Sequence, residues 1–164
     1  MTRRMNIAVL TVSDTRGLDE DTSGQYLVDG LISAGHQLKG RELCIDDKYQ
    51  IRARVSIWIA DPDIDCILVT GGTGFTQRDT TPDAVGILLE KNVDGFGELF
   101  RAVSYLEIGT ATVQSRAFAG VTNETLVFCL PGSTGACRTA WDKILVEQLD
   151  IDHKPCNFAE ILGR

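Results

Sequence analysis

The chain is organised as short apolar runs separated by segments in which apolar residues recur every three or four positions. Short runs that are apolar throughout are typical of parallel strands, which are buried on both faces of a sheet. The expected strands cover Ile7 to Val12, Gln37 to Ile45, Ile64 to Thr70 and Thr125 to Leu130.

Segments with helical periodicity lie between and after these strands. Pro82 stands at the favoured first position of one of them, and Gly35 is a typical stop for another. We assign no structure to the tail from Asp150. The expected helices begin at a cap at Thr22 or Ser23, at Asp47, at Thr81, at Phe96, and at Ser133 or Thr134.

Alternation of strands and helices of this length predicts an α/β fold with three layers: a mainly parallel sheet with helices on both faces and right-handed crossovers. We find no linker, repeat or low-complexity tract along the sequence. The expectation is therefore one domain over residues 1–164.

In such a fold the loops that follow the strands meet at one edge of the sheet, where ligands bind near the point at which the strand order reverses. These loops carry hydroxyl groups, carboxylates and glycines. They are Ser13-Asp14, Asp46-Asp47, Gly71 to Asp79, and Pro131-Gly132-Ser133-Thr134. Their convergence is more specific than any one of them.

The loop between Thr70 and Thr81 contains Gly71, Gly72, Thr73 and Gly74 and ends with Arg78 and Asp79. Glycines allow backbone N–H groups to approach a phosphate, and the helix that follows has a positive N-terminal end. The loop lacks the Gly-Lys-Ser/Thr of a Walker A motif and the third glycine of a Rossmann fingerprint. A plain strand-to-helix turn is the structural alternative, but Arg78 as a donor to an anion and Asp79 as a ligand for a cation such as Mg²⁺ favour a ligand site.

Asp47 and Asp79 are the expected catalytic acids, and together they form a candidate Mg²⁺ site beside a polyphosphate. Asp47 also lies three residues before Gln50, which is the spacing of a helix cap, and that reading is equally compatible with the sequence. Asp79 has a weaker structural explanation. Asp83 falls in the first turn of the expected helix, where it complements the helix dipole.

Two further segments carry candidate ligand contacts. Pro131, Gly132 and Ser133 precede a helix and offer a second anion site, with a capped turn as the alternative. Arg116 lies among small residues that would allow close approach of a planar ligand, although alone it reads as a surface arginine.

Composition narrows the class of partner. A formal charge of −7 and a pI near 4.8 argue against nucleic acid and acidic membranes, and no apolar run approaches the length of a membrane span. Five cysteines without a Cys-x-x-Cys pair, and no export signal, favour a reducing cytosol. His36 and His153 are isolated, so neither a zinc site nor a Ser-His-Asp triad is expected.

Over nearly its whole length the chain resembles the molybdopterin adenylyltransferase family, which includes the G domain of gephyrin, and within it the B branch of molybdenum cofactor biosynthesis proteins. The segments that carry the resemblance are Thr11 to Asp14, Asp21 to Gly24, Thr70 to Asp83, Gly95 to Glu98, Ser115 to Ala117, Leu130 to Ser133, and Pro155 to Phe158.

The resemblance implies transfer of AMP from Mg-ATP to molybdopterin by a cytoplasmic trimer or dimer of trimers. It assigns Asp47 and Asp79 to Mg-ATP placement and transfer. Gly71, Gly72, Thr73 and Gly74 match the nucleotide loop, and Ser13 and Asp14 line the same pocket. Ser115 matches the pterin-site serine, with Arg116, Pro131, Gly132 and Ser133 beside it.

The B branch includes members in which the first aspartate is replaced, whereas this chain keeps both acids. The alternative to an enzyme is a non-catalytic pterin- or nucleotide-binding paralogue of the same pathway. A scaffold module is a third reading, and the lack of an appended domain makes it the weakest.

Overall fold

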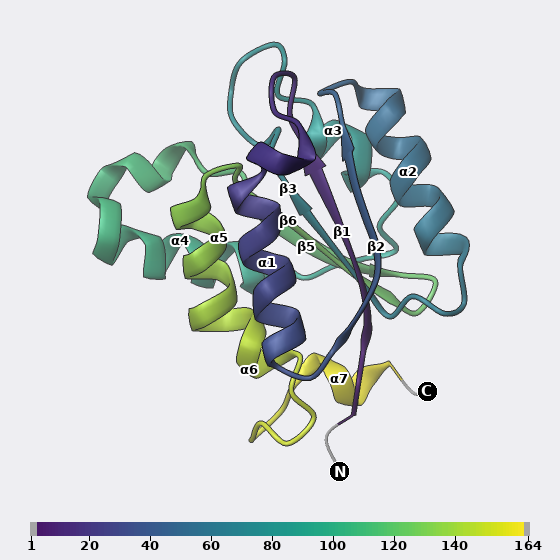
Figure 1. Cartoon of the computed structure of the whole chain (residues 1–164). Coiled ribbons are helices and arrows are strands. Elements are labelled where there is room, and N and C mark those ends of the chain that lie inside the picture. The colour runs from purple at the N-terminus through teal and green to yellow at the C-terminus, as the bar shows by residue number, and fades with distance from the viewer. Residues whose placement is uncertain (1–2, 163–164) are drawn as a thin grey trace.

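The strands form one mixed sheet in the order β2-β1-β3-β6-β5-β4 in the computed structural model, which describes residues 3–162 (Figure 1). β2, β1, β3 and β6 are parallel, and β5 runs antiparallel to both β6 and β4. The strands are β1 (Asn6–Val12), β2 (Gln37–Cys44), β3 (Cys66–Thr70), β4 (Lys91–Asn92), β5 (Phe118–Thr122) and β6 (Thr125–Leu130).

Helices cover both faces of this sheet, which confirms the three-layer α/β fold (Figure 1). The α-helices are α1 (Thr22–Ser33), α2 (Lys48–Ala60), α3 (Thr81–Gly86), α4 (Asp94–Ile108), α5 (Thr134–Ala140), α6 (Val146–Gln148) and α7 (Phe158–Ile161). The 3₁₀ segments η1 (Leu18–Glu20) and η2 (Gly109–Gln114) and the π-helical turn η3 (Trp141–Leu145) complete them.

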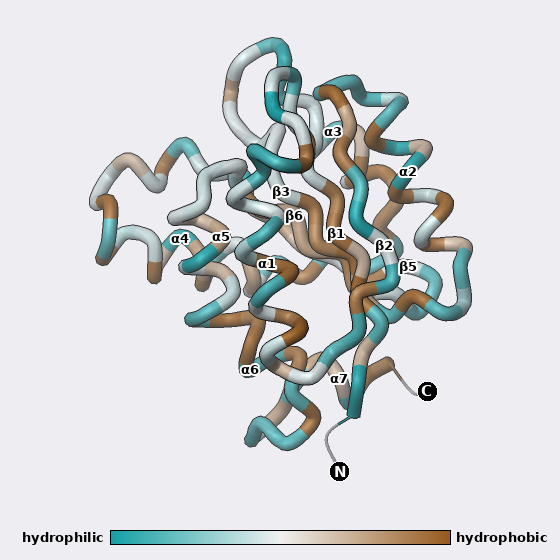
Figure 2. The backbone as a smooth tube through the Cα atoms, viewed as in Figure 1, coloured by the Kyte–Doolittle hydropathy of each residue, from teal (hydrophilic) through white to brown (hydrophobic). Residues whose placement is uncertain are grey.

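Alternate residues of the central strands feed two separate hydrophobic cores. Ile7 and Val9 of β1 pack with α1, α4, α5 and α7, whereas Ala8 and Leu10 pack with α2 and α3. Figure 2 shows the central strands as the most hydrophobic part of the tube. Burial on both faces holds the sheet rigidly, so the loops at its edge have a fixed base. No helix within residues 3–162 is long and apolar enough to cross a membrane.

The expected parallel strands are confirmed, and several boundaries and caps need correction. Asp21, not Thr22 or Ser23, caps α1, since its side chain accepts from Gly24 N. Ser133 caps α5 as expected, by accepting from Ala136 N at 3.1 Å. The additions include the strands β4 and β5, which extend the sheet beyond β6, and α7 in the tail that was expected to be irregular.

Candidate active site

A cavity of about 580 Å³ opens at the edge of the sheet where the parallel strands end. Its volume is within the usual range for small-ligand sites. The predicted residues that line it are Ser13, Asp14, Gly71, Gly72, Thr73, Gly74, Arg78, Asp79, Ser115, Pro131, Gly132 and Ser133. The loops after β1, β2, β3 and β6 therefore converge as expected.

A second wall of the cavity was not foreseen from the sequence. α4 and η2 contribute it, together with Ser115 at the end of η2. Because β5 runs antiparallel, its beginning lies at the edge where the parallel strands finish, and this brings the residues just before it to the cavity. The added lining residues are Phe100, Ser104, Ile108, Ala111, Thr112 and Gln114.

The glycines after β3 are required by their close contacts. Gly71 has φ +104°, and a Cβ there would lie 2.2 Å from the carbonyl oxygen of Val12. Gly72 has φ +70°, and its Cβ would lie 2.3 Å from Thr81 Oγ1. L-residues rarely adopt these positive φ angles. The glycines therefore allow the loop backbone to pack directly against Val12 at the end of β1 and Thr81 at the start of α3.

Asp46, rather than Asp47, is the acid of this loop that lines the cavity. Asp46 is buried, and its Oδ1 accepts from Thr80 N at 3.1 Å and from Thr80 Oγ1 at 2.7 Å. Asp47 caps α2 instead, with Oδ1 accepting from Tyr49 N and Gln50 N. Strand periodicity contained the signal, because Cys44 and Asp46 are both buried while Ile45 between them is exposed.

Asp79 lines the cavity and also stabilises its own loop. Its Oδ2 accepts from Thr76 N at 2.9 Å and from Thr76 Oγ1 at 2.7 Å. No described residue donates a hydrogen bond to Asp79 Oδ1 or to Asp46 Oδ2. These hard oxygen donors are of the kind that Mg²⁺ prefers, and the ion usually takes only one or two carboxylates beside phosphate oxygens. Within residues 3–162, no three or more His, Cys, Asp or Glu side chains are grouped so that they could hold a metal ion by themselves.

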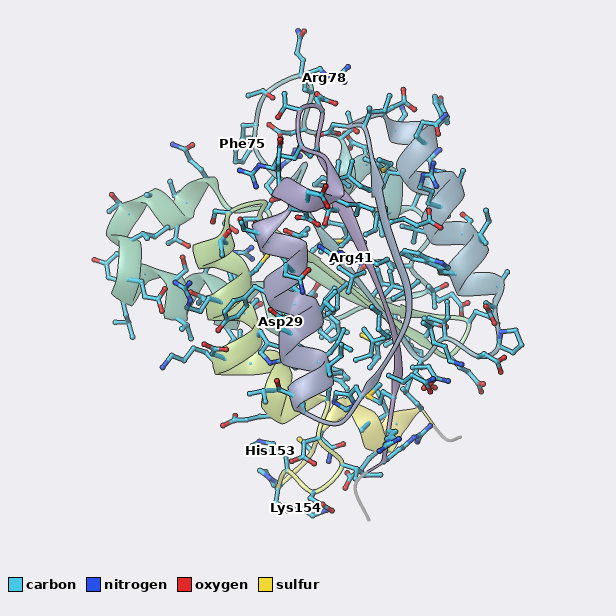
Figure 3. The ribbon with its side chains drawn as sticks, viewed as in Figure 1. Asp29, Arg41, Phe75, Arg78, His153 and Lys154 are labelled. Carbon is cyan, nitrogen blue, oxygen red and sulfur yellow. The ribbon has the colours of Figure 1, made fainter. Side chains whose placement is uncertain are left out.

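Arg78 and Asp14 form a bidentate ion pair at the mouth of the cavity. Arg78 Nε donates to Asp14 Oδ2 at 3.0 Å, and Nη2 donates to Oδ1 at 2.8 Å. The hydrogen bonds from Arg78, followed by the one from Asp46 N, lower the pKa of Asp14. The Arg78 side chain is 63% exposed and stands at the upper end of the molecule in Figure 3. It is therefore accessible to an anion in the cavity.

Arg116 lies behind the glycine loop and is not among the cavity-lining residues. Its Nε donates to Thr73 O at 3.3 Å, and its Nη2 donates to the carbonyls of Gly74 and Asp79. The guanidinium carbon also lies 5.0 Å from the centre of the Phe75 ring. Ser115 and Arg116 were predicted together as pterin or phosphate contacts. Of the two, Ser115 lines the cavity and Arg116 does not.

Fold and site together define an α/β domain with a glycine-loop ligand cavity at the ends of its parallel strands. Residues 8–151 match the family model described as probable molybdopterin binding domain. The chain belongs to this family.

Relatives with known names agree. Molybdenum cofactor biosynthesis protein B of Escherichia coli K12 is 53% identical over 152 residues, which cover 93% of this chain and 89% of that protein. The protein of the same name from Bacillus cereus is 43% identical, covering 90% and 88%.

Solved structures share the fold. A crystal structure of molybdenum cofactor biosynthesis protein B has a TM-score of 0.87 and 43% identity, covering 90% of this chain and 92% of that one. The tungsten cofactor synthesizing protein MoaB from Pyrococcus furiosus has a TM-score of 0.78 and 38% identity, covering 88% and 92%.

Proposed function

We propose that this chain acts in molybdenum cofactor biosynthesis by transferring AMP from Mg-ATP to the terminal phosphate of molybdopterin. An oxygen of that phosphate bonds to the α-phosphorus of ATP, and the bond from the α-phosphorus to the β-bridging oxygen breaks. Adenylylated molybdopterin and pyrophosphate are the products. The pathway assignment rests on the named relatives and the family model.

The observation that carries the chemical proposal is the joining of three features around one cavity. These are a glycine loop with positive φ angles, the acids Asp46 and Asp79, and a second wall that contains Ser115. Phosphoryl-type transfer needs positioning and charge stabilisation rather than a covalent nucleophile, so the absence of a triad is no objection.

Each side of the cavity has its own role in the proposal. The glycine loop and Arg78 bind the triphosphate through N–H donors, while Ser115 and the wall from α4 and η2 hold the pterin. Pro131, Gly132 and Ser133 face the phosphate that links the two substrates. Asp46 Oδ2 and Asp79 Oδ1 would hold Mg²⁺, which when bound offsets the negative charge of the phosphates.

Assembly and location also belong to the proposal. Exposed apolar side chains gather on α4 and η2: Leu99, Tyr105, Leu106, Ile108 and Val113. Such a group is typical of a protein interface and supports the trimer or dimer of trimers that the family resemblance implies. The buried cysteines and the acidic surface support a cytoplasmic protein.

A binding subunit without activity is the alternative, and one observation favours it: Asp47 and Asp79 both have structural hydrogen bonds. The deciding experiment measures pyrophosphate release with molybdopterin and Mg-ATP for the wild type, Asp79→Asn and the control Asp83→Asn. Asp83 lies in the first turn of α3, outside the cavity lining.

The enzyme proposal expects a loss of turnover on the order of 10²-fold in Asp79→Asn and almost none in Asp83→Asn. Tight pterin binding by a wild type that releases no pyrophosphate would establish the binding subunit instead.

A further inference from the structure

We propose that Arg116 is a positioning residue that holds the glycine loop in its phosphate-binding conformation and does not bind substrate itself. The inference rests on the proposed nucleotide function of the cavity and assigns a separate role to one residue beside it.

The hydrogen bonds that Arg116 donates all go to backbone carbonyls of a single loop, whose Phe75 ring also lies against the guanidinium. It donates to Thr73 O, Gly74 O and Asp79 O, which spans the loop from its first turn to its last residue. No ion pair within residues 3–162 includes Arg116. Its positive charge therefore acts on the loop carbonyls, as charge-assisted hydrogen bonds that are stronger than neutral ones.

Peptide planarity converts these contacts into a direction for the N–H groups. In a trans peptide the carbonyl and the next residue's N–H point to opposite sides. Binding of Thr73 O and Gly74 O by Arg116 therefore turns the N–H groups of Gly74 and Phe75 away from Arg116. Neither N–H donates to another described residue, and Gly74 lines the cavity, so its N–H is available as a phosphate donor.

The peptide between Asp79 and Thr80 is held from both ends. Arg116 donates to Asp79 O at 3.1 Å, while Thr80 N donates to Asp46 Oδ1 at 3.1 Å. This fixes the backbone that carries Asp79, and it links the loop to the buried acid of the cavity. Loss of Arg116 would leave the carbonyl of Asp79 without this donor and free this end of the loop.

Arg116 is itself held in place by α4. Arg101 donates to Ala117 O at 3.1 Å and to Ser115 O at 3.4 Å, on either side of Arg116. A Cβ at Gly97 would lie 2.7 Å from Ala117 O and 2.9 Å from Arg101 Nη2. The glycine at position 97 therefore leaves room for Arg101, and this connects α4 to the loop through residues 115–117.

The test compares Arg116→Ala with Arg52→Ala in the full chain. Arg52 is a matched control, because its Nε and Nη2 donate to Ala84 O at 3.0 Å and Asp83 O at 2.9 Å, outside the cavity lining. The measurements are amide hydrogen exchange without ligand at Thr76, Asp79 and Thr80, whose N–H groups are hydrogen-bonded, and the Kd values for Mg-ATP and for molybdopterin separately.

We expect Arg116→Ala to speed exchange at Thr76, Asp79 and Thr80 and to raise the Kd for Mg-ATP about tenfold, as for loss of a charge-assisted hydrogen bond. The Kd for molybdopterin should stay near the wild-type value. Added methylguanidinium should restore both properties in Arg116→Ala, and Arg52→Ala should match the wild type.

A raised Kd for molybdopterin with unchanged loop exchange would overturn the proposal and make Arg116 a substrate contact. Unchanged exchange alone would also overturn it. If Arg116→Ala does not fold, Arg116→Lys serves, because lysine keeps the charge without the planar fork of donors. A wild type that binds no Mg-ATP would refute the nucleotide function, while the exchange comparison would still decide the role of Arg116.

Discussion

Asp46 and Thr80 join the end of β2 to the start of α3, because one carboxylate oxygen of Asp46 accepts from both the backbone N–H and the hydroxyl of Thr80. The acid is thereby buried with its second oxygen free of hydrogen bonds from described residues. Its neighbour Asp47 is occupied with the first turn of α2. Adjacent residues thus serve a cavity and a helix cap.

This division predicts opposite outcomes for two matched variants. Asp46→Asn should lower pyrophosphate release on the order of 10²-fold, because a charge facing the phosphates is lost while an amide oxygen can still accept from Thr80. Asp47→Asn should keep wild-type turnover, because asparagine caps helices as well as aspartate does. The reverse pattern in steady-state assays would make Asp47 the functional acid.

Gly71 provides a test of the loop that needs no substrate. Gly71→Ala should lower the free energy of unfolding by about 2 kcal/mol or more, because φ is positive and the Cβ would meet the backbone oxygen of Val12. Gly95→Ala is the control, since its Cβ would have open space in α4 and alanine favours helix. In urea unfolding Gly95→Ala should be neutral or stabilising, and an equal loss in both variants would contradict the strain argument.

Thr112 has a buried hydroxyl without a hydrogen-bond partner among the described residues, although it lines the cavity. Thr112→Val removes this unsatisfied group at nearly constant shape and should raise the free energy of unfolding by about 1 kcal/mol. Thr125→Val should lower it by a similar amount, because the fully buried Thr125 donates to Ile64 O. Thermal melts of both variants check the difference in sign.

The Arg78–Asp14 pair predicts a shift that NMR can measure. Arg78 lowers the pKa of Asp14, so Arg78→Gln should move the carboxyl titration of Asp14 to higher pH. The melting temperature at neutral pH should barely change, because exposed ion pairs contribute little to stability. A titration midpoint that does not move would mean that Arg78 does not pair with Asp14 in solution.

Cys44 predicts a loss of stability at alkaline pH. Burial raises the pKa of its thiol from 9.0 to about 11. Between these values the unfolded chain loses a proton that the folded chain keeps, so the free energy of unfolding should fall as pH rises from 9 towards 11. Cys44→Ala should show a shallower fall in urea unfolding measured at both ends of this range.

The central parallel strands and the meeting of their loops were predictable because buried strands are apolar on both faces and their ends define one edge. β5 was not, since Phe118–Thr122 is short and contains Gly120, and pairing with β6 rather than its own composition makes it a strand. The wall from α4 was missed for a related reason. A helix that faces both a core and a cavity presents apolar residues to both, so its sequence pattern does not distinguish the two. Phe100 of α4 illustrates this, because it packs in the core and also lines the cavity.

The choice between Asp46 and Asp47 shows a different limit. Both follow a strand, and only the point at which β2 ends decides which side chain turns inward. Arg116 was predicted as a ligand contact, whereas it lies outside the cavity lining and donates to backbone carbonyls, and such contacts cannot be read from the sequence.

The antiparallel direction of β5 has a consequence for how this cavity can be altered. Its walls are encoded in separate stretches of chain: the acids and the glycine loop precede residue 80, the second wall lies within residues 100–115, and Pro131, Gly132 and Ser133 follow later. Residues 100–115 could therefore be replaced as a unit, with Arg101 retained and Arg116 left in place. Such a replacement would change which ring system the cavity accepts and leave its phosphate side unaltered.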